Sequence, residues 1–152
     1  EQAAAAVAAT RYPPHGVRSF GPLRASMGHD TTTLQSRVST FAMIETTAGL
    51  AAVEDICAVP GLSGIYVGPA DLAISLGVSA LQFTSDPTVL EAIARAHRAA
   101  TAAGVVAGIH AGNGAAGRQL AALGFQMITL GTESLSLRRG AAAHLDDAAG
   151  PR

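Results

Sequence analysis

The chain has 152 residues, of which 49% are apolar, with a mean hydropathy of +0.32 and a formal net charge of −1. A chain of this length buries a substantial core, and a charge so close to zero excludes the broad basic surface of a nucleic-acid-binding protein. No apolar run reaches the roughly 18 residues of a membrane span, so we expect a cytoplasmic protein with neither nucleic acid nor membrane as a partner.

The reactive side chains are few. All ten basic residues are arginines, so no lysine can form an imine with a carbonyl substrate. The single cysteine, Cys57, excludes an intrachain disulfide and lies in a helical pattern, where we expect a buried core thiol rather than a nucleophile. A reducing, cytoplasmic setting fits this cysteine content.

The first 40 residues differ from the rest of the single partial domain that we assign to residues 1–152. They begin as the end of a helix and continue into a loop rich in proline, glycine and arginine, without a predicted strand. Because a domain seldom starts in the middle of a helix, we expect further sequence upstream.

From residue 41 onward, four short apolar strands alternate with helices. The predicted strands are 41–46, 62–68, 105–112 and 125–133, and the predicted helices are 48–61, 70–77, 86–104, 113–124 and 134–150. The helix over 86–104 has the clearest ends, with Asp86 as N-cap, Pro87 in the first turn and Gly104 as the stop. Such βα units predict an α/β fold with a parallel sheet, either open or half of an eight-stranded barrel.

Two carboxylates follow neighbouring strands at equivalent points. Glu45 stands at the end of the first strand and Asp71 just past the second. Since the carboxyl ends of parallel strands meet at one rim, we expect the two acids to lie close together. Two such carboxylates repel each other unless a cation lies between them, and oxygen ligands favour Mg²⁺ or Mn²⁺.

Each acid also has a structural alternative. Asp71 is a possible N-cap of the short helix that follows it, and Glu45 is a possible helix-start acid favoured by the helix dipole. Gly68, Pro69 and Ala70 lie between them in sequence, and such small residues at a helix start let backbone amides approach an anion.

The motifs "RYPPHGVRSFGP", "MIETTAGLAAVEDICAVPGLSGIYVGPADLAISLG" and "AGIHAGNGAAGRQLAALGFQMITLGTESLSL" together resemble the HpcH/HpaI aldolase family over essentially the whole chain. The resemblance implies a (β/α)₈ TIM barrel, of which this chain carries about four βα units, the carboxyl-terminal half.

The resemblance also implies a reaction and its site. Glu45 and Asp71 match the family's metal ligands, and the turn formed by Gly68, Pro69, Ala70 and Asp71 matches the segment whose amides, at Ala70 and Asp71, hold the carboxylate of pyruvate. The implied function is a class II aldolase, a metal-dependent lyase that cleaves 4-hydroxy-2-oxo acids to pyruvate and an aldehyde through a metal-stabilised enolate. The implied cofactor is Mg²⁺ or Mn²⁺, with Co²⁺ as a further candidate, and the implied partners are a small 2-oxo acid and an aldehyde.

Two residues of this chain are candidates for a catalytic role. The family's catalytic histidine and arginine come from the first half of the barrel, so we expect both outside this chain. His110 ends the third strand and is a candidate for the aldehyde pocket or for proton transfer, although a rim histidine bonded to backbone remains open. Glu133 follows the fourth strand and is a weaker candidate. Met43 stands where many relatives carry glutamine, so we expect one polar substrate contact to be lost or supplied differently.

Two other functions remain open. One is a truncated, non-catalytic barrel half that acts only in assembly, since half barrels expose strand edges and apolar surface. The other is a citrate-lyase-like lyase that acts on a CoA thioester. For any of these functions, the resemblance implies a homo-oligomer in which the last helix packs on a neighbouring subunit.

Overall fold

The computed structural model describes residues 1–21 and 24–150, and its elements follow the alternation that the sequence predicts. Positions 22–23 of the predicted loop and 151–152 of the assigned domain lie outside the described residues. Ahead of the sheet are α1 (Gln2–Thr10), the short 3-10 helix η1 (Ala25–Met27) and α2 (Thr31–Ser36). The strands are β1 (Phe41–Ile44), β2 (Gly64–Val67), β3 (Val106–His110) and β4 (Met127–Thr129). The remaining helices are α3 (Thr47–Ala51), α4 (Val53–Cys57), α5 (Pro69–Ser75), η2 (Ala80–Gln82), α6 (Pro87–Ala103), α7 (Gly114–Ala122) and α8 (Glu133–Ala149).

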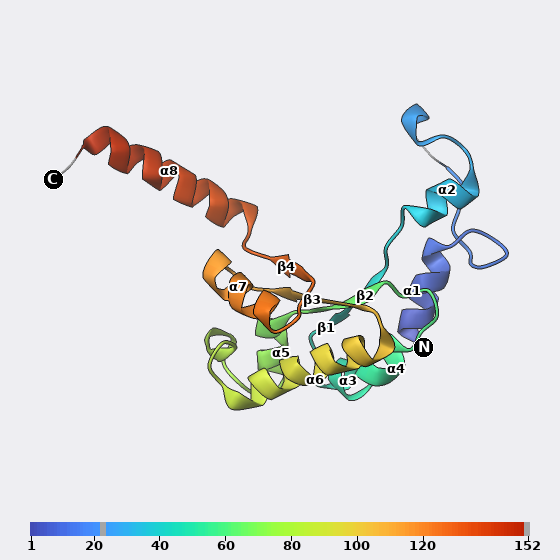
Figure 1. The fold of residues 1–152 in the computed structure, drawn as a ribbon, viewed down its shortest axis with the longest axis horizontal. Helices are drawn as coiled ribbons and strands as arrows, with labels where there is room; N and C mark the ends of the chain where they lie inside the picture. Colours follow the sequence, from blue (N-terminus) through green and yellow to red (C-terminus); the bar gives the residue numbers. More distant parts are fainter. Residues whose placement is uncertain (22–23, 151–152) are drawn as a thin grey trace.

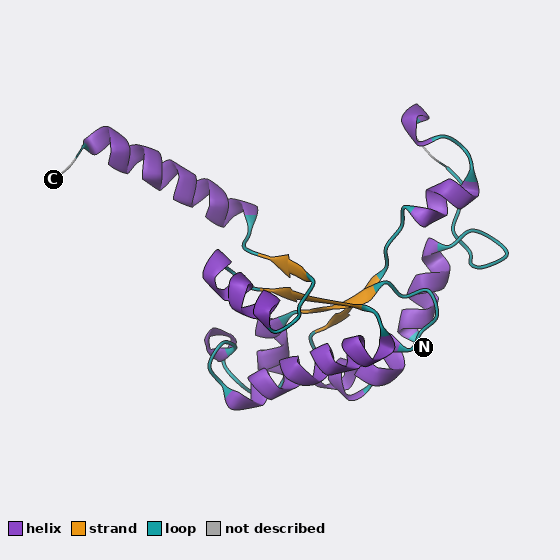
Figure 2. Cartoon of the chain, in the orientation of Figure 1, coloured by secondary structure: helices purple, strands orange, loops and turns teal. Residues whose placement is uncertain are grey.

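The four strands form one parallel sheet in the order β1-β2-β3-β4. The strands are drawn in orange in Figure 2. The register places Ile44 beside Val67 and Val67 beside Ile109. Consecutive parallel strands joined by helices are the arrangement of a partial (β/α)₈ barrel, which confirms the predicted fold class.

The two faces of the sheet have different surroundings. One face points its aliphatic side chains toward α4, α5 and α6, which lie beneath the sheet in Figure 1. Ile44, Val67 and Ile109 on this face are almost fully buried. The residues that alternate with these along each strand point to the opposite face of the sheet, which no described helix covers. Met43 on this open face is 54% exposed. The covered face is therefore the core, and the open face leads to the carboxyl rim.

Most element ends agree with the sequence, with two differences. Each strand is shorter than predicted, because the residues at its ends turn into the adjoining loops. The single helix predicted over 48–61 is wrong: Ala52, at φ −104° and ψ 14°, separates α3 from α4. By contrast, α6 has the predicted ends, with the Asp86 carboxylate accepting from the Thr88 and Val89 amides and Gly104 in the left-handed region.

The residues before the sheet pack at the amino-terminal ends of the strands. Val7 of α1 belongs to the core, and the Arg11 guanidinium donates to the carbonyls of Gln35 and Gly61. The predicted loop contains α2, whose N-cap Asp30 accepts from the Thr33 amide at 2.7 Å. This helical turn was not predicted, since the surrounding composition is that of a loop.

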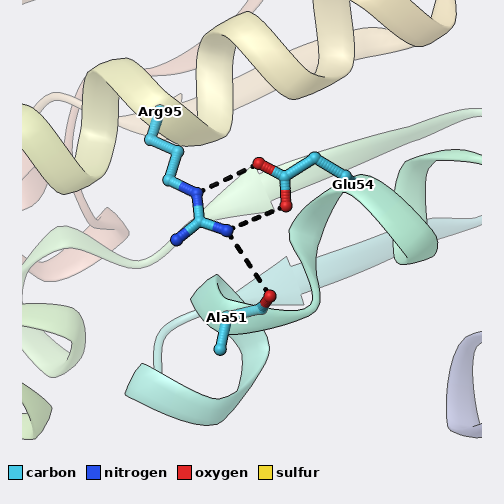
Figure 3. A network of polar contacts seen from close by, with 3 residues as sticks. All are labelled: Ala51, Glu54 and Arg95. Carbon is cyan, nitrogen blue, oxygen red and sulfur yellow. Dashed lines mark hydrogen bonds and ion pairs between the residues drawn. The ribbon is translucent and has the colours of Figure 1, made fainter.

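The junction of α4 and α6 holds the cysteine and an ion pair. Cys57 is 3% exposed and its burial raises the pKa of the thiol, which confirms a core thiol. At the same junction, Arg95 donates to both carboxylate oxygens of Glu54, at 3.0 and 2.9 Å, and to the Ala51 carbonyl (Figure 3). The ion pair ties α4 to α6 at the surface.

The last helix stands apart from the sheet. In Figure 1, α8 extends away from the other elements, and none of its 17 residues is buried. Among the described helices, none has both the length and the apolar character that crossing a membrane would require.

Candidate metal and substrate site at the carboxyl rim

Glu45 lies between the end of β1 and the start of α3. The N-cap of α3 is Thr46, whose hydroxyl accepts from the Gly49 amide at 3.0 Å. Glu45 therefore precedes the helix and is not a helix-start acid, so that structural alternative is wrong. The strand positions its side chain on the open face of the sheet, because it alternates with the buried Ile44.

Asp71 lies in the first turn of α5. The N-cap of that helix is Gly68, with Pro69 in the first turn, and no side chain caps its amides. The N-cap alternative for Asp71 is therefore wrong as well. Its carboxylate forms no hydrogen bond or ion pair within the described residues.

One hollow brings the predicted residues together. It has a volume of about 230 Å³ and opens at the carboxyl ends of the strands. Its lining contains all six predicted site residues, which are Glu45, Gly68, Pro69, Ala70, Asp71 and His110. It also contains three residues that the site prediction did not include, Met43, Tyr66 and Phe83. The convergence that the sequence predicts for Glu45 and Asp71 is thus present.

Gly68 is what allows Glu45 to lie over the end of β2. A methyl group at Gly68 would come within 3.1 Å of Glu45 Oε2 and 3.2 Å of Glu45 Cβ. Such distances are tighter than ordinary contacts, so any larger residue would displace the carboxylate. The glycine is needed here for close approach, since its φ of −95° is open to other residues.

The hollow has an excess of negative charge. Among the described residues that line it, Glu45 and Asp71 are acidic and none is an arginine, while both ion pairs, Glu54 with Arg95 and Glu91 with Arg98, lie elsewhere. No group of three or more His, Cys, Asp or Glu side chains that could hold a metal occurs within residues 1–21 and 24–150. Two carboxylates with the remaining positions left to water or substrate oxygens are a common setting for Mg²⁺. The donor set and the space kept open by Gly68 therefore fit a divalent cation.

The turn into α5 can receive an anion beside that cation. The amides of Ala70 and Asp71 belong to the first helical turn, which has no intrahelical partners for its N–H groups. Because Gly68 offers no capping side chain, these amides remain available. A carboxylate is an anion of suitable size and charge for this position.

A third group of polar side chains lies on the same wall. The His110 ring, at the end of β3, has Nδ1 2.8 Å from Thr129 Oγ1 of β4, and the same hydroxyl bonds the Tyr66 hydroxyl of β2. The alternative of a rim histidine bonded to backbone is thus wrong. Strand alternation was the only signal for Tyr66 and Thr129, since both share a sheet face with Glu45 and His110.

The predictions for Met43 and Glu133 have different outcomes. Met43 does line the hollow, so the wall is apolar at this position. Glu133 begins α8 and does not line the hollow. A direct role for Glu133 therefore has no geometric support in the described chain.

Comparisons with known proteins agree with this geometry. Residues 1–140 match the sequence model of the family described as HpcH/HpaI aldolase/citrate lyase. A hydroxypyruvate/pyruvate aldolase of Rhizorhabdus wittichii is 38% identical over 92% of this chain and 57% of its own length. A 5-keto-4-deoxy-D-glucarate aldolase of Klebsiella pneumoniae is 35% identical over 97% of this chain and 59% of its own length.

Solved structures extend the similarity to three dimensions. The crystal structure of an HpcH/HpaI aldolase/citrate lyase family protein from Burkholderia cenocepacia superimposes with a TM-score of 0.85 and 34% identity, over 97% of this chain and 60% of that one. The chain thus spans little more than half the length of these relatives. By the sequence match, the identities and the shared fold, the chain belongs to the HpcH/HpaI aldolase/citrate lyase family.

Proposed function

We propose that this chain provides the metal-binding and carboxylate-binding part of a divalent-metal-dependent aldolase. The reaction is cleavage of a 4-hydroxy-2-oxo acid into pyruvate and an aldehyde, or the reverse addition. The observation that carries the proposal is the convergence of Glu45, Asp71 and the turn at Gly68 on one hollow. The names of the relatives, hydroxypyruvate/pyruvate aldolase and 5-keto-4-deoxy-D-glucarate aldolase, support the substrate class.

The groups that line the hollow would have different roles in this reaction. Glu45 and Asp71 would hold the cation, and the amides of Ala70 and Asp71 would hold the substrate carboxylate next to it. When bound, a divalent cation such as Mg²⁺, Mn²⁺ or Co²⁺ supplies the positive charge that stabilises an enolate. Met43 and Phe83 provide the apolar parts of the wall.

The metal-dependent route is the one that the residues of this chain can supply. Aldolases without a metal hold their substrate as an imine on a lysine amine. No residue of this chain has such an amine.

A CoA-thioester lyase is the second candidate, because the family description includes citrate lyase. The anionic phosphates of CoA call for cationic side chains beside the acyl site. Among the described residues that line the hollow none is an arginine, so we favour the aldolase.

We also propose that the protein works in the cytoplasm as a homo-oligomer. The single buried cysteine supports a reducing compartment. Support for assembly comes from α8, a helix of 17 residues without a buried side chain, since a single helix of this length is only marginally stable in water.

The test is release of pyruvate from 4-hydroxy-2-oxo acids by the purified full-length protein, with and without EDTA. We expect turnover that EDTA abolishes and that Glu45→Ala lowers at least about 100-fold. Glu91→Ala is the matched control, because Glu91 is an exposed carboxylate paired with Arg98 on α6. Turnover that resists EDTA, or that survives in Glu45→Ala, contradicts the proposal; no turnover on any such acid supports the non-catalytic alternative.

A further inference from the structure

Three hydrogen-bonding side chains form a chain beside the two carboxylates, and the proposed function uses none of them. They come from neighbouring strands: Tyr66 from β2, His110 from β3 and Thr129 from β4. Thr129 pairs with His110 in the sheet register. All three face the open side of the sheet, as Glu45 does.

The Thr129 hydroxyl is the centre of this chain. Its Oγ1 lies 2.8 Å from His110 Nδ1 and also bonds the Tyr66 hydroxyl. A threonine hydroxyl has one hydrogen to donate and lone pairs to accept, so it can serve one neighbour as donor and the other as acceptor. It therefore links the protonation pattern of His110 to Tyr66.

The direction of the hydrogen bonds follows from the strengths of the donors and acceptors. A phenol hydroxyl is more acidic than an aliphatic one, so Tyr66 is the better donor and the Thr129 oxygen the better acceptor in their contact. The Thr129 hydrogen is then directed to Nδ1 of His110, since an imidazole nitrogen is a stronger acceptor than a hydroxyl oxygen. This order makes Nδ1 the acceptor and places the hydrogen of the neutral ring on Nε2.

The Nε2 atom is the ring nitrogen that remains available for a ligand. The imidazole lines the same hollow as Glu45 and Asp71, and no hydrogen bond to Nε2 occurs in the part of the chain that the structure describes. The carboxylates suit a cation and the Ala70 and Asp71 amides suit the carboxylate of the 2-oxo acid. The imidazole N–H is thus left for the second substrate.

We propose that Thr129 fixes neutral His110 as the Nε2–H form, and that this N–H donates a hydrogen bond to the aldehyde oxygen. That oxygen is the carbonyl oxygen during addition and the C4 hydroxyl oxygen during cleavage. A fixed donor stabilises the negative charge that develops on it as the carbon-carbon bond forms or breaks. The inference rests on the proposed function and adds a hydrogen bond to it, with no new covalent step. His110 is then a catalytic residue, whereas Thr129 and Tyr66 are positioning residues.

The first test reads the ring directly and needs no turnover. Long-range ¹⁵N–¹H correlation spectra of the full-length protein, at a pH where the ring is neutral, report which nitrogen carries the hydrogen. We expect Nε2–H for His110, a mixture of both forms in Thr129→Val, and recovery in Thr129→Ser. His144, exposed on α8, provides an internal reference. An Nδ1–H ring in the wild-type protein, or an unchanged ring in Thr129→Val, overturns the proposal.

The second test separates the aldehyde from the 2-oxo acid. Metal-dependent exchange of the methyl hydrogens of pyruvate in D₂O needs no aldehyde, whereas aldol cleavage involves the aldehyde oxygen. We expect His110→Gln to lower kcat for cleavage about 100-fold and to leave the exchange rate within about twofold. Equal loss of both rates overturns the inference, because it places His110 on the pyruvate side. Absence of exchange in the wild-type protein contradicts the proposed function instead.

Positioning variants complete the test. Thr129→Val is expected to lower kcat for cleavage about tenfold with KM for the acid unchanged, and Thr129→Ser to restore it. Thr101→Val is the matched control, since the Thr101 hydroxyl donates to a backbone carbonyl within α6. Tyr66→Phe should cost less than Thr129→Val, because Thr129 can still donate to His110. A larger loss in Tyr66→Phe overturns the assigned direction.

Discussion

At the scale of single residues, the site depends on a glycine as much as on its two acids. Glu45 reaches over the end of β2 because Gly68 has no side chain, and the nearest carboxylate oxygen is only 3.1 Å from where a methyl group would lie. The carboxylate and the anion-binding turn therefore share one small space. We therefore expect a substitution at Gly68 to weaken metal binding more than it lowers the stability of the fold.

Gly68→Ala tests this dependence. The added methyl group displaces the Glu45 carboxylate, so we expect the affinity for Mn²⁺ to fall about tenfold with little change in the unfolding midpoint. Mn²⁺ titration followed by electron paramagnetic resonance measures the first quantity and thermal unfolding the second. Gly114→Ala is the control, because a methyl group there meets nothing within 4 Å. Equal affinity in both variants would show that Glu45 is not held by this contact.

The acids were predictable from the sequence, whereas the polar chain beside them was not. Glu45 and Asp71 follow strands of one parallel sheet, and the rule that such ends share a rim is enough to bring them together. Tyr66 and Thr129 are 63 residues apart, and their contact depends on β3 lying between them in the correct register. The pattern of residues within each strand does not specify this register, so the contact could not be predicted from it.

At the scale of elements, the residues at a helix end carry the signals that end the helix. A break between two helices depends instead on how they pack in the fold. Asp86, Pro87 and Gly104 fix α6 through caps and backbone preferences that each residue carries by itself. The apolar spacing through Leu50, Val53 and Cys57 continues across Ala52, so periodicity predicts one helix. The break instead lets α4 pack against α6, which is a tertiary effect.

The ion pair between α4 and α6 predicts a dependence of stability on pH. Hydrogen bonding to Arg95 lowers the pKa of Glu54 from its ordinary value of 4.5. The folded chain thus takes up this proton at lower pH than the unfolded chain does, so the pair stabilises the fold above pH 4.5. That contribution is lost as the pH falls through the lowered pKa.

Urea unfolding of Glu54→Gln, Arg95→Gln and the double variant measures this effect. We expect a small coupling free energy at about pH 7, in keeping with an exposed pair, and a progressive loss of it as the pH falls through the lowered pKa of Glu54. A coupling that persists unchanged in acid would mean that the contact seen in Figure 3 stabilises the fold without its charge.

At the largest scale, the described helices cover one side of the sheet and leave the other side open. The core is built by α1 and the described helices from α3 to α7, and the other face carries exposed side chains such as Met43. The parallel α/β sheet followed from the alternation of strands and helices, and the barrel followed from the family resemblance. The position of α8 did not, because nothing in its own sequence says what it packs against.

Assembly through α8 is the prediction at this scale. Leu137 and Leu145 lie two turns apart on α8 and are 75% and 71% exposed. Burying them on a neighbouring subunit would offset the cost of association, so Leu137→Asp with Leu145→Asp should lower the mass seen by light scattering after gel filtration. Ala143→Asp, on the opposite side of the helix, should leave it unchanged. An unaltered mass in the double variant would argue against assembly through this helix.

Calorimetric titration of Mn²⁺ into the full-length protein, its Glu45→Gln and Asp71→Asn variants and the double variant tests most directly whether the two acids share one cation. Since both carboxylates line the same hollow, we predict one ion per chain and a loss of at least about tenfold in affinity for either single variant. The double variant should lose less than the sum of the two, because residues that hold one ion are not independent. Wild-type affinity in either single variant, or losses that simply add, would contradict a shared site.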